Sequence, residues 1–259
     1  MSDKLANVHV HKFEEDDYID VWFMGDMHLG HEGFNLKEFK KYVEWVKGAD
    51  NRYVIGMGDY IECATKSGAP GKALLSQSIS ITGQVEVFVK LLEPIKDRIV
   101  CLLAGNHEER IAKEGFDILA QAIAPRLGTV YLGYEHWVKL KGKKYYYNLY
   151  IHHGPNTKAN SSSYHLEKLI KAGFGVADLL AMGHNHRIFV NKYNTPVVVG
   201  DTVRKHSCWA LRTGGFLDYP SYARKKLYEP ADIGSPIVRF YFNKKEIAVY
   251  SGLEHYNGC

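Results

Sequence analysis

The sequence predicts an α/β protein: a four-layer α/β/β/α sandwich in which two stacked mixed sheets are covered by helices on both outer faces. Three observations lead to this prediction. Helical patterns alternate with short apolar runs in the first half of the chain, strand-like runs dominate the second half, and five apolar runs end in polar motifs. Alternating strands and helices form parallel sheets with helices on their faces. Because functional groups gather beyond the carboxyl ends of such strands, we expect the functional site there.

The first half contains three predicted strands, each a short buried run: Val21–Met24, Tyr53–Met57 and Ile99–Ala104. Three helices are predicted around them: Phe34–Val46, Val85–Leu92 and Glu108–Ala124. Asn35 is the expected cap of the first helix, with Glu38 three residues later as its capping-box partner. The second helix should end near Pro94 and the third at Pro125, because proline does not continue a helix.

The second half is interpreted mainly as strands, namely Val130–Leu132, Trp137–Leu140, Tyr145–Ile151, Leu179–Met182, Ile188–Val190, Pro196–Val199, Ile237–Phe242 and Ile247–Tyr250. Two helices are predicted there, Tyr164–Lys171 and Ser221–Leu227. The pairs Gly142–Lys143 and Asn243–Lys244 are expected to form hairpin turns. No repeat or linker divides the halves, so residues 1–259 are interpreted as one domain.

Composition excludes several classes of protein. Hydrophobic residues make up 46% and charged residues 24%, which excludes a disordered tail, a collagen-like fibre and a low-complexity linker. No apolar stretch reaches the roughly 18 residues that a membrane span requires. The polar, acidic N-terminus differs from a secretory signal, and the four scattered cysteines suit a reducing compartment. We therefore expect a cytoplasmic protein without a membrane partner.

Histidine is abundant, with 13 residues in a chain whose net charge is only +4. Six of these histidines lie in five short motifs, each directly after an apolar run: Gly25-Asp26-Met27-His28, Gly58-Asp59-Tyr60-Ile61-Glu62, Gly105-Asn106-His107-Glu108, His152-His153-Gly154 and Gly183-His184-Asn185-His186. Strand ends of one sheet lie side by side, so these motifs should converge. The alternative, a set of ordinary hydrogen-bonded histidines, leaves the ordered spacing unexplained.

Carboxylate, amide and imidazole donors suit hard and borderline divalent metals. The set holds more donors than one ion normally takes, but two ions about 3.5–4 Å apart and bridged by a carboxylate would use them all. Asp59 is the expected bridge, because it follows a central strand of the predicted order. We expect Mn²⁺, with Fe²⁺, Zn²⁺ or Ni²⁺ as alternatives. Only Cys63 adjoins the set, which argues against a closed structural zinc site.

The five motifs, in this order between residues 25 and 186, resemble those of the calcineurin-like metallophosphoesterase superfamily. The resemblance implies that a first metal is bound by Asp26, His28, Asp59 and His186 and a second by Asp59, Asn106, His184 and His153. It further implies that His107 is a catalytic general acid oriented by Glu62. His152 remains an alternative to His153, since adjacent residues of a strand point to opposite faces.

The resemblance implies hydrolysis of phosphoester bonds by a hydroxide that bridges the two metals, with His107 protonating the leaving group. A phosphodiesterase or nuclease is favoured, because the Gly-His-x-His form of the last motif is similar to that of repair nucleases. The alternative is a phosphomonoesterase acting on a phosphoprotein or small molecule. A non-catalytic interaction module, like the phosphoesterase-like subunit of retromer, is the alternative from another class.

A basic segment after the motifs bears on the substrate. Residues 203–234 include Arg204, Lys205 and Arg212 among interleaved aromatic residues, a combination that grips phosphates and stacks bases. The segment is therefore a candidate substrate-facing surface, with nucleic acid as the partner. An amphipathic hairpin and helix packed on the sheet edge explain the same pattern equally well.

Overall fold

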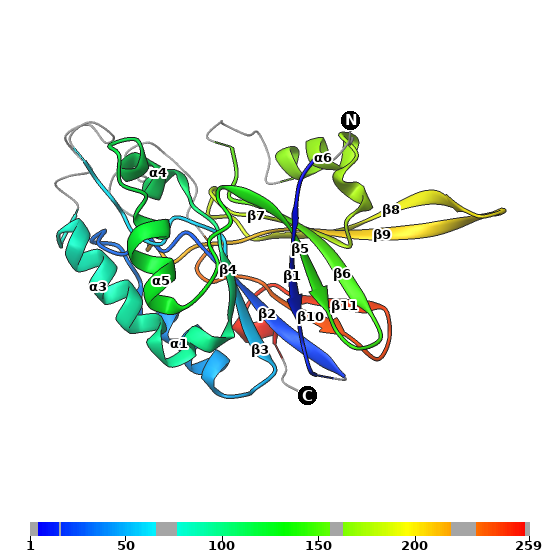
Figure 1. The fold of residues 1–259 in the computed structure, drawn as a ribbon, viewed down its shortest axis with the longest axis horizontal. Helices are drawn as coiled ribbons and strands as arrows, with labels where there is room; N and C mark the ends of the chain where they lie inside the picture. Colours follow the sequence, from blue (N-terminus) through cyan, green and yellow to red (C-terminus); the bar gives the residue numbers. More distant parts are fainter. Residues whose placement is uncertain (1–4, 16, 66–76, 156–162, 219–231, 257–259) are drawn as a thin grey trace.

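Two stacked sheets form the centre of the structure, a computed structural model that describes residues 5–15, 17–65, 77–155, 163–218 and 232–256 (Figure 1). The six-stranded sheet has the order β1 (Val8–Lys12), β5 (Glu135–Lys141), β6 (Tyr146–His152), β7 (Leu179–Met182), β9 (Thr202–Arg212) and β8 (Phe189–Val199). The five-stranded sheet has the order β11 (Glu246–Tyr250), β10 (Ile237–Tyr241), β2 (Tyr18–Met24), β3 (Arg52–Gly56) and β4 (Ile99–Leu102). Both sheets are mixed, which confirms the predicted stacked arrangement.

Six parallel strands direct the chain segments that follow them to the same side of the sandwich. In the five-stranded sheet β2, β3 and β4 are parallel neighbours. In the six-stranded sheet β6, β7 and β9 are parallel neighbours as well. The carboxyl ends of parallel strands share one sheet edge, so the loops that leave these strands are brought together.

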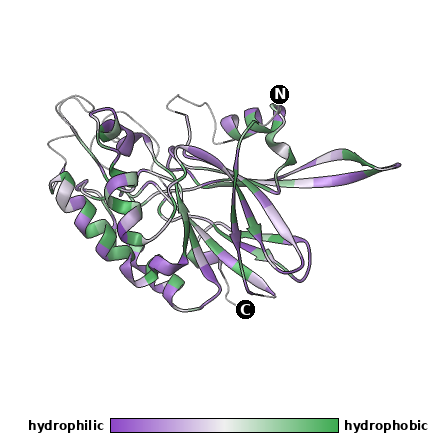
Figure 2. Ribbon diagram, in the orientation of Figure 1, coloured by the Kyte–Doolittle hydropathy of each residue, from purple (hydrophilic) through white to green (hydrophobic). Residues whose placement is uncertain are grey.

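Helices cover the two outer faces. The five-stranded sheet packs against α1 (Leu36–Lys47), α3 (Ile81–Leu92), α4 (Asn106–Ala112) and α5 (Ala124–Leu127), and the six-stranded sheet against α6 (Tyr164–Lys171) (Figure 1). Shorter helical turns lie at Glu93–Arg98, Leu119–Ile123, Phe174–Val176 and Leu253–His255. Figure 2 shows alternating apolar and polar bands along α1 and α3, as expected of helices with one buried side.

The hydrophobic core consists of three clusters: one on the outer face of each sheet and one between the sheets. Trp22 packs with Phe39 of α1 on the outer face of the five-stranded sheet, whereas its neighbour Phe23 lies between the two sheets. On the outer face of the six-stranded sheet, Leu180 of β7 and Leu166 of α6 belong to one buried cluster. Successive residues of a strand point to opposite faces, so a strand buried on both sides must be apolar throughout. The continuous apolar run at the end of β2 therefore reflects a central strand.

The predicted helix Glu108–Ala124 is wrong as a single element. Helix α4 ends at Ala112, and Gly115 turns the chain with a φ of 95°. A turn with i→i+5 bonding, Leu119–Ile123, then precedes α5, whose first turn contains Pro125. Proline lacks an N–H, so it fits the first turn of a helix and begins α5 where the sequence interpretation ended a helix.

Two further differences concern strands. The predicted runs Ile188–Val190 and Pro196–Val199 belong to one strand, β8, because Pro196 lies on a sheet edge where no partner needs its missing N–H. Strand β9 is not among the predicted strands. It occupies the first part of the basic segment 203–234, for which a hairpin on the sheet edge is the alternative interpretation, and it forms such a hairpin with β8. Helix Ser221–Leu227 lies outside the described residues. In place of the predicted strand Val130–Leu132 there is a single bridge between Tyr131 and Leu102.

Strand β1 was also not predicted, because its pattern reverses the usual rule. Val8 and Val10 are exposed, while His9 and His11 turn toward the other sheet. The predicted hairpin turns at 142–143 and 243–244 are confirmed by the antiparallel pairs β5–β6 and β10–β11. Within the described ranges no helix is long and apolar enough to cross a membrane.

Candidate metal centre

Five loops meet where the parallel strands of the two sheets end. The loop after β2 is bound to the loop after β3, since the backbone N–H of Asp26 donates to the carbonyl of Gly58 (3.0 Å). The loop after β7 reaches the same place, because the N–H of His184 donates to the Asp26 carboxylate (2.9 Å). The loop after β4 joins through the N–H of His107, which donates to Oδ1 of Asp59 (2.9 Å). The sequence motifs are thus brought together.

These loops hold an unusual backbone conformation. Among the described residues, six other than glycine have positive φ: Asp26, His28, Asp59, Cys63, His184 and His186. L-residues in this left-handed region cost about 1–2 kcal/mol each relative to the right-handed one. Such strain persists only where surrounding contacts impose it, and it clusters at functional sites.

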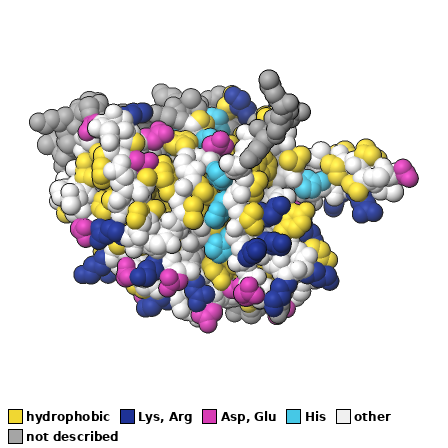
Figure 3. Space-filling view, in the orientation of Figure 1, with side chains coloured by type: hydrophobic (Ala, Val, Ile, Leu, Met, Phe, Trp, Pro, Cys, Tyr) yellow, Lys and Arg dark blue, Asp and Glu magenta, His cyan; other side chains and the backbone are white. Residues whose placement is uncertain are grey.

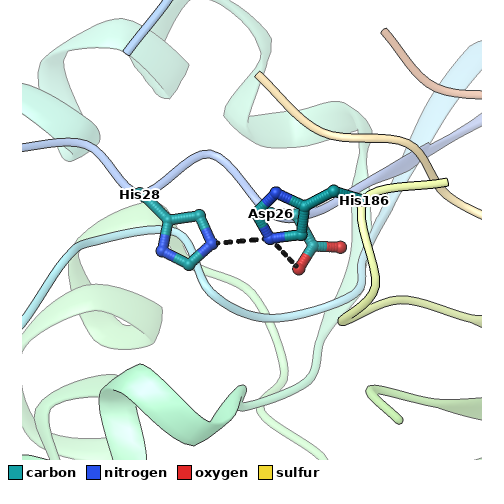
Figure 4. Close-up of side chains that lie close together, drawn as sticks. All are labelled: Asp26, His28 and His186. Atoms are coloured by element: carbon teal, nitrogen blue, oxygen red, sulfur yellow. Dashed lines mark hydrogen bonds and ion pairs between the residues drawn. The ribbon is translucent and has the colours of Figure 1, made fainter. Parts of the chain in front are cut away.

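The first group of donors consists of Asp26, His28 and His186, whose ligand atoms all lie within 4.8 Å of one another (Figure 4). Nε2 of His28 lies 3.0 Å from Nε2 of His186, which in turn lies 3.5 Å from Oδ1 of Asp26. Two imidazole nitrogens and a carboxylate oxygen therefore face a common point. The three residues come from the ends of two different sheets.

The second group consists of Asp59, His153 and His184, also within 4.8 Å of one another. Nε2 of His153 lies 3.3 Å from Oδ2 of Asp59 and 3.2 Å from Oδ1 of Asn106. Nδ1 of His153 lies 2.7 Å from the carbonyl of Met57, to which it donates. In the neutral imidazole a donating Nδ1 leaves the lone pair on Nε2, the atom that faces the other donors.

Asp59 joins the two groups. Its Oδ2 lies 3.8 Å from Nε2 of His28 in the first group and 3.3 Å from Nε2 of His153 in the second. The side chain is almost fully buried, so it cannot turn away to solvent. Asp59 follows β3, a central strand flanked by β2 and β4.

The pKa values of three donors, His184, His186 and Asp59, leave them unprotonated and ready for a cation. Burial together with His153 lowers the pKa of His184 to about 4, and burial with His28 holds the pKa of His186 well below its ordinary value. Burial alone would raise the pKa of Asp59, but His107 and His153 hold it well below its usual range. Three other donors favour a proton. Burial acts to lower the pKa of His153 and that of His28, yet Asp59 and Asp26 raise the first to about 9, and Glu62 and Asp59 raise the second. Burial raises the pKa of Asp26 to about 6.

A pair of divalent cations fits this donor set. Nδ1 of His184 is buried and has no hydrogen-bond partner among the described residues, as expected of a group that ligates rather than hydrogen-bonds. In the metal-free protein the proton on His153 neutralises the buried carboxylates, a role that a cation would take over. Imidazole nitrogen and carboxylate oxygen suit borderline divalent metals.

His107 lies beside both groups, and one of its ring nitrogens is within 4.8 Å of ligand atoms of His28 and Asp59, a third combination that could hold a metal. Its Nδ1 donates to the backbone carbonyl of Glu62 (2.8 Å), and its Nε2 lies 3.9 Å from Oδ2 of Asp59. The Glu62 carboxylate is 3.5 Å from the His107 ring but 3.2 Å from Nδ1 of His28. Glu62 therefore orients two histidines, His107 chiefly through its carbonyl and His28 through its carboxylate.

The two adjacent histidines after β6 diverge. His153 is fully buried within the second group. His152 points away: its Nδ1 accepts the N–H of Gly154 (2.7 Å), and its ring lies beside Tyr134 and Tyr150. Strand alternation separates the pair, and the structure brings His153 rather than His152 to the other donors.

The sequence interpretation did not single out Glu108, which fastens two of the loops. Its buried carboxylate accepts four backbone N–H groups, from Asp59, Tyr60, Ile61 and Gly105, at 2.7–3.2 Å. Asp59 cannot change its backbone conformation without breaking these bonds. The available signal was the acidic residue that directly follows Asn106 and His107.

Two residues beyond the five motifs also fasten the loops. Oγ1 of Thr213 donates to Oδ2 of Asp26 (3.2 Å). Asp232 accepts the N–H of Ile188 through its carboxylate (2.7 Å) and donates its own N–H to the carbonyl of His186 (2.9 Å). No sequence pattern marked either residue.

The candidate substrate residues are separated in space. Arg212 is buried at the end of β9, where it donates to the carbonyl of Gly183 (3.3 Å) behind His184. Arg204 and Lys205 are exposed on the projecting β8–β9 hairpin, which bears basic side chains in Figure 3. Eight residues of strand separate Arg204 from Arg212, a span of about 26 Å at about 3.3 Å per residue. The structure does not bring Arg204 and Lys205 to the metal centre.

Comparisons with known proteins agree with the five motifs. The family model of the calcineurin-like phosphoesterases matches residues 19–188, about two thirds of the chain. No curated protein sequence matches. Two of the solved structures that are similar to this chain share low sequence identity with it. One is Vps29 of Entamoeba histolytica with Zn²⁺, with 11% identity, a TM-score of 0.44, and coverage of 89% of this chain and 97% of that one.

The other is a protein of Streptococcus pneumoniae described as a predicted phosphoesterase, with 13% identity and a TM-score of 0.41. That alignment covers 93% of this chain and 94% of the other. Neither structural likeness is needed to identify the family, because the family model spans all five strand-end motifs, from Ile19 in β2 to Ile188. The chain belongs to the calcineurin-like phosphoesterases.

Proposed function

We propose that this protein is a phosphoester hydrolase that depends on two divalent metal ions. The observation that carries the proposal is the position of Asp59, which belongs to the second donor group and lies 3.8 Å from Nε2 of His28 in the first. The first ion would be held by Asp26, His28, Asp59 and His186, and the second by Asp59, Asn106, His153 and His184. When bound, the two cations supply Lewis acidity and lower the pKa of water toward neutrality.

The chain's own residues supply orientation and proton transfer. Glu62 and the carbonyl of Met57 fix the rings of His28 and His153, so that Nε2 of each imidazole faces inward. The side-chain amide of Asn106 lies beside His153 at the edge of the centre, where its N–H₂ is placed to donate to a phosphoryl oxygen. These groups are set before substrate arrives.

His107 is the proposed general acid. Burial lowers its pKa to about 4, so the imidazole is neutral in the ligand-free protein at neutral pH. A negatively charged phosphoryl group beside the ring would favour the imidazolium and raise that pKa. His107 would then give the proton from Nε2 to the leaving oxygen, while Nδ1 stays bonded to the carbonyl of Glu62.

Within this reaction class we favour a phosphodiester, with nucleic acid as its source. The Gly183-His184-Asn185-His186 motif supports this choice, and the exposed basic residues Arg204 and Lys205 would contact a long polyanion beyond the scissile bond. A phosphomonoester is the alternative substrate, and the relative rates on a diester and a monoester distinguish the two substrate classes.

The test uses metal-stripped protein reloaded with Mn²⁺, Fe²⁺, Zn²⁺ or Ni²⁺ and assayed on bis-(p-nitrophenyl) phosphate and p-nitrophenyl phosphate. We expect about two ions per chain and hydrolysis that requires them, with the diester preferred. Preference for the monoester would overturn the substrate assignment. Two bound ions without hydrolysis of either ester would overturn the enzymatic assignment and indicate a binding module.

A further inference from the structure

Arg110 contacts the proposed catalytic histidine. It lies on α4, three residues after His107, so both side chains project from the same side of the helix. Nη2 of Arg110 lies 2.9 Å from Nε2 of His107, and Nη1 donates to the carbonyl of Glu62 (3.0 Å). The carboxylate of Glu62 is farther away, at 3.8 Å from Nη1. The guanidinium therefore binds the same carbonyl as His107 and also the ring itself.

The chemistry of these groups fixes the direction of the contact. A guanidinium has only donors, so Nε2 of His107 must be the acceptor in this arrangement. The same ring donates from Nδ1 to the carbonyl of Glu62, which is consistent with a neutral imidazole protonated on Nδ1. While Arg110 occupies Nε2, that nitrogen is not available to a leaving group. A working site therefore requires Nη2 of Arg110 to find another acceptor.

The exposed fractions of the side chains around the centre indicate the side from which an acceptor for Nη2 of Arg110 would approach. The side chains of Asp26 and His153 are fully buried, whereas those of His107, Arg110 and His186 are 12%, 19% and 20% exposed. Among the described residues, Arg110 and these two histidines are thus on the more open side of the centre. A phosphoryl group that approaches the metal donors passes this side, and arginine is well suited to bind its oxygens in a forked geometry.

We propose that Arg110 forms a phosphate-binding subsite of this centre: Nη1 stays on the carbonyl of Glu62, while Nη2 moves from His107 to a phosphoryl oxygen. This inference rests on the proposed function, because it takes the ligand to be a phosphoryl group at the metal centre. Phosphate binding would thereby free Nε2 of His107 at the moment when substrate is in place. The arginine charge would add to that of the metals in holding the phosphoryl group.

The experiment measures the affinity of the Mn²⁺-loaded protein for inorganic phosphate by calorimetry. Arg110→Gln removes the charge and the fork, and we expect its affinity to fall about 10- to 100-fold, the range for lost charged hydrogen bonds. Arg110→Lys keeps the charge, so it should recover part of this loss. Lys113→Gln is the matched control, because it removes a charge from an exposed position just after α4. Its affinity should stay within about twofold of wild type.

Metal content and thermal stability are measured on the same samples. Unchanged phosphate affinity in Arg110→Gln would overturn the subsite, as would an equal loss in Lys113→Gln or loss of metal from Arg110→Gln. Failure of the wild-type protein to bind phosphate would also overturn it. If phosphate binding depends on Arg110 but neither nitrophenyl ester is hydrolysed, the subsite stands and the proposed hydrolase activity fails.

Discussion

The strand-end loops and the β8–β9 hairpin are two polar regions that differ in the burial of their charged side chains. In the loops, carboxylate and imidazole side chains are largely buried and fastened by backbone hydrogen bonds, and the ligand atoms of each donor group lie within 4.8 Å of one another. On the hairpin, Arg204 and Lys205 are exposed, and Val198 and Val203 near the turn are 78% and 69% exposed. Burial of unlike polar groups in one place indicates chemistry, whereas exposed charge along a strand indicates at most a contact surface.

Among the substitutions considered, Asp59→Asn should have the largest effect on metal binding and hydrolysis. The substitution keeps a side chain of the same shape but removes the charge shared by the two donor groups. We expect loss of at least one metal and of measurable hydrolysis, by elemental analysis and ester assay. Asp97→Asn, on a surface turn, is the control. Full metal content in Asp59→Asn would contradict the shared-ligand assignment.

His107→Ala separates proton transfer from metal binding. The side chain lies beside the donor groups and belongs to neither proposed ligand set. We expect kcat to fall about 10²- to 10⁴-fold, the usual contribution of a general acid, with metal content unchanged. A substrate with a nitrophenolate leaving group needs less protonation and should lose less activity than an alkyl ester. Loss of metal in this variant would make His107 a ligand instead.

Glu108→Gln tests the fastening of the loops. The buried carboxylate accepts four backbone N–H groups, and glutamine has a single acceptor oxygen to share among them. Changes to groups that orient ligands typically cost about 10- to 100-fold in metal affinity or activity, and we expect this range. The neighbouring Glu109→Gln is the control. Equal effects of the two substitutions on metal affinity would argue against a special role for Glu108.

Metal affinity should rise with pH. The pKa of His153 in the metal-free protein is about 9, so below that pH a metal must displace a proton, and affinity falls as pH falls. The sign is opposite for stability of the metal-free protein. A raised histidine pKa stabilises below the unfolded value near 6.5, and this contribution is lost as pH rises through about 9. Calorimetry in buffers of different ionisation enthalpy at pH 7 should detect proton release on metal binding.

The double variant Arg204→Gln/Lys205→Gln should have the smallest effect. These residues lie about 23–26 Å along β9 from Arg212, so hydrolysis of a nitrophenyl ester should change less than about twofold. If nucleic acid binds along the hairpin, its affinity should fall and the salt dependence of binding should become less steep. A large loss of activity on the nitrophenyl ester would contradict this prediction and indicate that Arg204 or Lys205 acts at the metal centre.

The sequence predicted the fold class, most strands and the convergence of the five motifs. These succeed because a buried strand must be apolar and a parallel strand must end beside its neighbours, so the signals are local. Asp59 illustrates this: a glycine and an aspartate after a buried run were enough to place it. The contacts of Glu108 and Thr213 depend on segments far apart in the chain, and no local pattern encodes them.

The remaining errors also have physical causes. Strand β1 presents valines outward and histidines inward, so its hydrophobic pattern is reversed at the sheet edge. Strand β9 was not placed among the predicted strands because the basic residues at its start favoured an exposed substrate-facing surface over a strand paired in the sheet. Arg212 belongs to the same basic segment as Arg204, yet it is buried because the strand runs from the solvent into the sheet. Composition alone does not distinguish the two ends of such a strand.

The left-handed backbone of the ligand loops limits how this centre can change during evolution. At Asp26 and Asp59 a substitution must preserve an oxygen donor and also tolerate a φ near +50°. Asparagine meets both conditions better than other residues, whereas threonine and other β-branched residues fail the second. Drift at these positions should therefore lead to asparagine, which removes one negative charge and leaves the loop intact. The backbone thus favours relatives that keep the conformation of these loops while they bind metal more weakly, before it permits relatives in which the loops themselves have changed.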